Sequence, residues 1–166
     1  MVQIRPEAPR DSAPIHGVHA AAFPTDAEAR LVGHLRDANR LSISLVAIVG
    51  SGIVGHVAFS PVMVDTIAGG LGLAPVGVLP AFQRRGIGSR LIEEGLAHAR
   101  AVRVPFVVLL GAPAYYARFG FGPASAFGLR DEYGGGSAFQ VIELIEGAIP
   151  RDGGLVRYAP EFALVE

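Results

Sequence analysis

The chain has 166 residues, no cysteine and a formal net charge of −1, from 14 Lys and Arg against 15 Asp and Glu. That length suits one domain, residues 1–166, because two smaller domains would each bury too little surface to be stable. Without cysteine there are no disulfides, thiolate metal sites or cysteine nucleophiles. The near-zero charge argues against nucleic acid or an acidic membrane as a partner.

No apolar run approaches the roughly 20 residues that a membrane-spanning helix needs. The N-terminus, Met1 to Pro6, lacks the apolar core of a signal peptide. No residue pattern indicates a metal site. We therefore expect a soluble, cytoplasmic protein.

The first half of the chain predicts two helices and three strands. The helices are expected over Ala13–Phe23 and from Thr25, which forms a capping-box pattern with Glu28, to about Asn39. Strands are expected at residues 3–5, Ser44–Val49 and Ile53–Val64, with turns at Gly50–Gly52 and Asp65–Gly70.

The second half centres on a strand, a helix and a strand: Leu71–Leu79, Gly86–Val102 and Phe106–Leu110. Pro75 interrupts the first of these strands and favours a bulge, because proline removes a donor from the ladder. A short helix at Pro113–Phe119 and strands at Phe127–Arg130 and Ala138–Ile145 follow. This order of elements predicts a mixed α/β sheet.

The segment from Leu73 to Leu91 reads LAPVGVLPAFQRRGIGSRL and joins the end of a strand to the longest predicted helix. A helix N-terminus has unpaired N–H groups and a partial positive charge, so it attracts anions. Gly86 and Gly88 let the backbone approach a phosphate closely. Arg84 and Arg85 add full positive charges, and the Ser89 hydroxyl is a further donor. These residues predict a phosphate-binding loop.

Two common phosphate loops do not fit. A Walker A loop needs Lys and Ser or Thr after the last glycine, and a dinucleotide-binding fingerprint needs a glycine at Leu91. The pattern Gln83-x-x-Gly86-x-Gly88 resembles instead the pyrophosphate loop of the GNAT N-acetyltransferase superfamily. The strand Pro75–Pro80 is similar to that family's cofactor strand.

A second motif, LLGAPAYYARFGF from Leu109 to Phe121, extends the resemblance. Tyr116 stands four residues before Gly120, where many members have a tyrosine that protonates the leaving thiolate of CoA. A phenol can donate in this way in a shielded site. The alternative is that Tyr115 and Tyr116 only pack in the core. The likeness is strongest to the small bacterial N-acetyltransferases called YhbS-like.

The resemblance implies a GNAT fold: a central twisted mixed sheet of about six to seven mostly antiparallel strands, a splayed parallel pair forming the CoA cleft, and about four flanking helices. It implies direct acetyl transfer from acetyl-CoA to a primary amine of a small molecule or protein, in a possible homodimer. The implied cofactor-binding residues are Val76, Gly77, Val78, Gln83, Arg84, Arg85, Gly86, Ile87, Gly88, Ser89 and Tyr115.

Several points stay open. The strand Leu71–Leu79 carries no carboxylate where many relatives place a base, and Glu28, His56 and Asp65 are candidates by residue type only. The missing carboxylate also supports a non-catalytic acyl-CoA-binding or sensing module as the alternative function. A longer acyl group or a hydroxyl acceptor is a weaker reading.

Overall fold

The computed structural model describes residues 1–166 as a nine-stranded sheet between two helical layers. The strands are β1 (Val2–Pro6), β2 (Ile43–Val49), β3 (Gly52–Val64), β4 (Ile67–Val78), β5 (Phe106–Leu110), β6 (Gly122–Pro123), β7 (Leu129–Asp131), β8 (Phe139–Glu143) and β9 (Gly154–Arg157). The helices are α1 (Ser12–Ala22), α2 (Ala27–Asp37), α3 (Ile87–Ala101) and α4 (Pro113–Tyr116), with short 3₁₀ turns that include Pro160–Val165.

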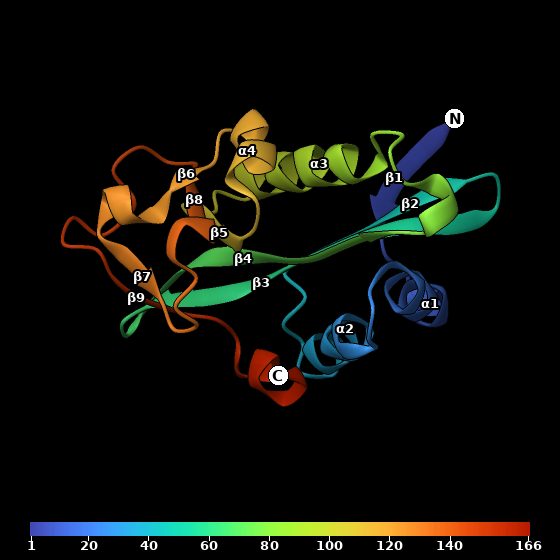
Figure 1. Ribbon diagram of the computed structural model, residues 1–166, viewed down its shortest axis with the longest axis horizontal. Coiled ribbons are helices and arrows are strands. Elements are labelled where there is room, and N and C mark those ends of the chain that lie inside the picture. Colours follow the sequence, from blue (N-terminus) through green and yellow to red (C-terminus); the bar gives the residue numbers. More distant parts are fainter.

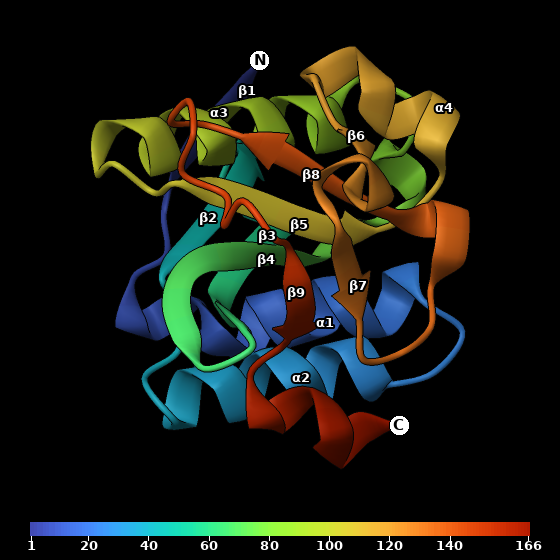
Figure 2. The same ribbon diagram turned by 90° about the vertical axis from the view of Figure 1, so that its left-hand side faces the viewer.

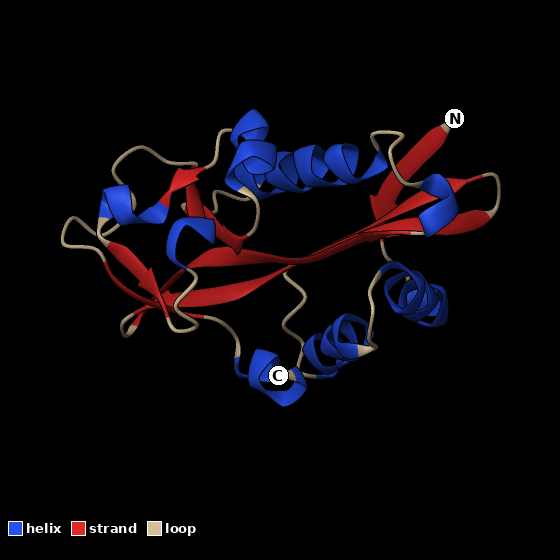
Figure 3. Ribbon diagram, viewed as in Figure 1, coloured by secondary structure: helices blue, strands red, loops and turns tan.

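The two helical layers lie on opposite faces of the sheet. In Figure 1, α3 and α4 lie above it, while α1, α2 and the C-terminal turn lie below. Figure 3 shows the same sandwich of helix, strand and helix. None of these helices combines the length and the apolar character that crossing a bilayer requires.

The strands follow the order β1-β2-β3-β4-β5-β8-β6, and β9 pairs with both β3 and β7. Every pairing is antiparallel except β4 with β5 and β7 with β9. This arrangement confirms the predicted mixed, mostly antiparallel sheet with four helices. The sequence did not predict β6 and β9, which have only two and four residues, too few to show a periodic pattern.

The central parallel pair separates soon after it forms. β4 and β5 are in register only at Leu71 with Val107 and at Gly72 with Val108. β4 continues to Val78 while paired with β3 on its other edge. The β3–β4 register shifts between Val57 and Phe59, opposite Pro75, which confirms the predicted bulge. Beyond Gly72, one edge of β4 therefore has no strand paired with it.

Two local predictions were wrong. The N-cap of α2 is Asp26, with no side-chain capping hydrogen bond, and Glu28 does not complete a capping box because one of its carboxylate oxygens is buried without a partner. Only the Ala27 N–H reaches the Thr25 hydroxyl, at 3.3 Å. The turn predicted at Asp65–Gly70 is shorter, because β4 already begins at Ile67. Gly70 lies within the strand, and the Phe106 ring occupies the space that a side chain at Gly70 would take.

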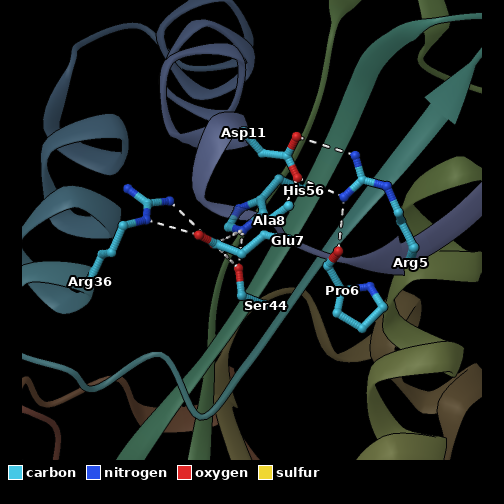
Figure 4. Close-up of polar contacts among 8 residues, drawn as sticks. All are labelled: Arg5, Pro6, Glu7, Ala8, Asp11, Arg36, Ser44 and His56. Carbon is cyan, nitrogen blue, oxygen red and sulfur yellow. Dashed lines mark hydrogen bonds and ion pairs between the residues drawn. The ribbon is translucent and has the colours of Figure 1, made fainter.

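A polar cluster of five residues, Glu7, His19, Arg36, Ser44 and His56, joins α1 and α2 to the sheet; Figure 4 shows all of them but His19. His19 and His56 are buried, and the other three are half-buried. The Glu7 carboxylate accepts hydrogen bonds from Arg36, at 2.9 and 3.2 Å, and from the Ser44 hydroxyl. His56 Nε2 lies 2.8 Å from Ser44 Oγ, and His56 Nδ1 lies 2.8 Å from His19 Nε2. The cluster thus runs without a break from α2 to α1.

The charge on Glu7 sets the proton positions along this cluster. Burial alone would raise the pKa of Glu7, but the interactions of its carboxylate with His56, Arg36 and Ser44 outweigh it and lower the pKa to about 2. Since Ser44 donates to the ionised carboxylate, it accepts from His56 Nε2–H, and His56 Nδ1 in turn accepts from His19 Nε2–H. His19 Nδ1 is left as a buried acceptor without a partner, 2.7 Å from where a Cβ on Gly77 would lie.

Both imidazoles are neutral in the folded protein. Burial lowers the pKa of His56, and burial together with His56 and His16 lowers the pKa of His19 to about 3. Below pH 6.5, the ordinary pKa of histidine, these two imidazoles become protonated in the unfolded chain but stay neutral in the folded chain. Stability is therefore full above that value and falls as the pH drops towards 3.

We expect the free energy of unfolding to decrease between about pH 6.5 and pH 5, by up to about 1.4 kcal/mol per pH unit for His19, with a contribution of the same sign from His56. This pH range lies above the pKa values of carboxylates in the unfolded chain, so the change in stability within it comes mainly from the imidazoles. Urea unfolding of the parent and of His19→Gln at several pH values measures the slope. The variant should show a shallower slope, and equal slopes would contradict the assignment to His19.

Candidate functional site

A hollow of about 440 Å³ opens at the N-terminus of α3, between the end of β4 and α4. Its lining combines apolar side chains, glycines and two arginines: Val78, Phe82, Gln83, Arg84, Gly86, Ile87, Gly88, Ser89, Tyr115 and Arg118. The hollow therefore lies at the loop that the sequence singled out for phosphate.

The backbone of this loop has amide groups without helical partners at residues that line the hollow. Arg84 and Gly86 adopt left-handed conformations, with φ of 64° and 79°, and Gly86 is the N-cap of α3. The Arg90 N–H donates to Gly86 O at 3.1 Å, closing the first turn of the helix. The N–H groups before it have no carbonyl one turn back to accept them. The Gln83 side chain donates to Val78 O at 2.9 Å and so fastens the loop to β4.

Helix α4 is tied to this loop through Tyr115. Its hydroxyl lies 3.0 Å from Ser89 Oγ. Arg118 Nε donates to Tyr115 O at 2.9 Å, and the Arg118 guanidinium lies 4.3 Å from the centre of the Tyr115 ring. Sequence reasoning missed Arg118, although its position three residues after Tyr115 places both on one side of the turn.

Phe82 is the other lining residue that the sequence did not suggest. Its ring lies 5.3 Å below the Arg85 guanidinium, and Arg85 does not line the hollow. The two arginines that border the hollow are Arg84 and Arg118.

Tyr116 points to a different place from Tyr115. Its ring lies against Gly111, where a Cβ would be 2.3 Å from the ring, and it does not line the phosphate hollow. Burial is the larger cause that raises the pKa of Tyr116, and the neighbouring Tyr115 is the smaller one. The phenol of Tyr116 therefore keeps its proton at neutral pH. Val76 and Gly77 also lie outside this hollow, on the part of β4 that is no longer paired with β5.

The three candidate bases lie apart from one another. Asp65 is in the β3–β4 turn and accepts the Leu155 N–H at 3.0 Å, which holds β9 to that turn. His56 is 0% exposed within the polar cluster. Glu28 lies in the first turn of α2. None of them lines the phosphate hollow.

Residues 40–123 match the family model described as an acetyltransferase (GNAT) domain. Over 96% of this chain and 97% of the relative, the sequence is 40% identical to the uncharacterized N-acetyltransferase YhbS of Escherichia coli strain K12. The crystal structure of E. coli YhbS in complex with CoA superposes with a TM-score of 0.94 at 38% identity, covering 98% of this chain and 92% of that one.

A second solved structure agrees. A GNAT family acetyltransferase from Brucella melitensis in complex with acetyl-CoA superposes with a TM-score of 0.83 at 39% identity, covering 98% of both chains. The chain belongs to the GNAT acetyltransferase family. The relatives are transferases, so the alternative of a non-catalytic sensing module is not supported.

The hollow makes Gly88 a test position. A Cβ at Gly88 would lie 3.8 Å from Val78 and 3.9 Å from the Tyr115 hydroxyl, so alanine fits the free protein but occupies the space before the loop amides. We expect Gly88→Ala to leave stability unchanged or higher by up to about 1 kcal/mol, and to weaken CoA binding by about tenfold or more.

The matched control is Gly33→Ala in α2, where an added Cβ meets nothing within 4 Å. It should gain the same helix stability and keep the parent's affinity. Thermal unfolding and calorimetric titration with CoA measure the two quantities. Unchanged affinity in Gly88→Ala would mean that the phosphates lie elsewhere.

Proposed function

We propose that the protein acetylates a primary amine, using acetyl-CoA whose pyrophosphate lies in the hollow at the start of α3. The observation that carries this proposal is the convergence there of free helix amides, Arg84 and Arg118. A diphosphate is the ligand that such a site favours. Both E. coli YhbS and the Brucella protein were crystallised with the cofactor or its product, which supports the same occupant.

The pantetheine arm is proposed to lie along the open edge of β4, at Val76, Gly77 and Val78. These residues pair with β3 on one edge, and no strand pairs with them on the other. The backbone groups on that free edge need partners, and the amide groups of pantetheine supply them. An N–H on the same edge would polarise the thioester carbonyl.

The reaction needs no covalent enzyme intermediate. The neutral amine nitrogen attacks the thioester carbonyl carbon, an N–C bond forms and the C–S bond breaks. The Tyr116 phenol is proposed to give its proton to the leaving thiolate and to recover one from the amine nitrogen or solvent. The balance is one amide, one thiol and one proton released from the ammonium form of the acceptor.

We further propose that residues 1–166 act as one cytoplasmic domain and that two copies pair through the C-terminal turn. The lack of cysteine is compatible with a reducing compartment. The 59% exposure of Leu164 in that turn supports a contact with a second copy.

We expect acetyl-CoA to raise the midpoint of thermal unfolding, because a ligand that binds only the folded state stabilises it. We also expect a panel of primary amines to release free CoA thiol. A thiol-reactive dye and mass spectrometry of the acetylated amine measure turnover. Absence of both protection and turnover would overturn the proposed function.

We expect Tyr116→Phe to lower kcat by about 10²-fold or more, with little change in the KM for acetyl-CoA, because only the proton transfer is lost. The matched control is Tyr115→Phe, which breaks the contact with Ser89 and should raise the KM for acetyl-CoA more than it lowers kcat. Steady-state kinetics at saturating amine separates the two. An unchanged kcat in Tyr116→Phe would remove Tyr116 from the proposed mechanism.

A further inference from the structure

A second, smaller hollow lies where β4 and β5 separate, on the face opposite α3. It has a volume of about 70 Å³ and an apolar lining: Leu73, Ala74, Leu110, Tyr133, Tyr158 and Phe162. Two of the rings come from the segment after β9, which runs into the C-terminal turn beside α2 (Figure 2). Residues from both separating strands and from the C-terminus thus meet at the splay.

Aromatic rings form the wall of this hollow. The Tyr158 ring centre lies 5.9 Å from that of Tyr133 and 5.1 Å from that of Phe162. Tyr158 is 8% exposed and packs over Gly72, where a Cβ would lie 2.8 Å from the ring. Its hydroxyl oxygen is buried without a hydrogen-bond partner. A buried hydroxyl that lacks a partner is costly unless a ligand supplies one.

Carboxylates surround these rings. Glu132 accepts the backbone N–H of Tyr158 at 2.8 Å, and Asp131 accepts that of Tyr133 at 3.1 Å. Burial, followed by Glu132 and Glu166, raises the pKa of Tyr133 to about 12. Arg130 lines a neighbouring hollow together with Asp131, and Arg157 lines another together with Tyr158. The carboxylates of Asp131 and Glu132 are the charged groups in hydrogen-bond contact with the backbone of the aromatic wall.

We propose that this hollow receives the acceptor, and that the acceptor is a compact monoamine with an apolar or aromatic stem. The proposal rests on the proposed function, since it names the substrate class of the same reaction. Ring faces and carboxylates attract an ammonium group, and the apolar floor accommodates its stem. The free Tyr158 hydroxyl accepts one amine N–H.

Other occupants gain less from these features. A zwitterionic amino acid would bring a carboxylate towards Asp131 and Glu132 and be repelled. A longer acyl chain would use the apolar walls but gain nothing from the carboxylates. For a monoamine, the ammonium is attracted at the acidic rim, and the apolar interior then disfavours its charge. The proton leaves to solvent, and the neutral nitrogen attacks the thioester carbon as the C–S bond breaks.

The experiment measures kcat and KM for 2-phenylethylamine, n-butylamine and phenylalanine at saturating acetyl-CoA. We expect the two monoamines to be acetylated with kcat/KM at least about tenfold above that of phenylalanine. Phe162→Ala should raise the monoamine KM by about threefold to tenfold. Glu132→Gln keeps the oxygen that accepts from Tyr158 but loses the charge, and it should raise the same KM to a similar degree.

The matched control is Glu94→Gln on the exposed side of α3, which removes the same charge far from the aromatic wall and should change no constant. Preference for phenylalanine, or a monoamine KM unaffected by both Glu132→Gln and Phe162→Ala, would overturn the proposal. A third result would also overturn the proposal. If Phe162→Ala changed the preference for acyl-chain length but left the amine KM unchanged, the hollow would belong to the acyl group.

Failure of this proposal is distinguishable from failure of the proposed function. If acetyl-CoA still protects the protein from unfolding and another class of amine is acetylated, the transferase assignment stands and the substrate class is wrong. If acetyl-CoA does not bind, the proposed function fails first.

Discussion

The separation of β4 from β5 after two registered pairs is the constraint on which the site depends. Had the two strands stayed paired to the end of β5, its last residues Leu109 and Leu110 would cover the edge of β4 at Leu73 and Ala74. Pro75 contributes to the break, because it brings no N–H to the ladder and lies at the bulge opposite β3. The phosphate hollow lies on the α3 side of the sheet, and the aromatic hollow lies on the α2 side.

Electrostatics differ between the two sides of the sheet. The α3 side has free helix amides with Arg84 and Arg118, which suit a polyanion. The α2 side has Asp131 and Glu132 around aromatic rings, which suit a cation. Under the proposed function, the cofactor would be attracted to the α3 side and a cationic acceptor to the α2 side. Such a division would suit direct transfer between them at the splay.

The features that the sequence could predict are contiguous in the chain. The turn into α3 at Gln83 to Ser89, the bulge at Pro75 and the short helix that carries Tyr115 and Tyr116 each lie within a short window, where residue type dictates backbone conformation. The capping box at Thr25 and Glu28 failed because tertiary packing at α2 decided the position of the Glu28 side chain.

Features assembled from distant segments were beyond the reach of local patterns. The aromatic hollow combines β4, β5 and the C-terminal turn, and nothing in any one segment marks it. By residue type alone His56 was a candidate base, and only its contacts with His19 from α1 and Ser44 from β2 place it in a polar cluster of the interior. The stacking of Arg85 on Phe82 is likewise a contact that residue type does not reveal, and the role of Arg85 towards the anion stays a prediction.

The polar cluster from Arg36 to His19 has a consequence for how this family can change over time. Because each hydrogen bond along it fixes the donor or acceptor role of the next, no single member can be exchanged for a residue of different polarity without stranding its neighbour. The five positions, scattered over the first 56 residues, should therefore be inherited together or lost together. A homologue in which Glu7 is apolar would be expected to carry compensating apolar residues at the other four positions.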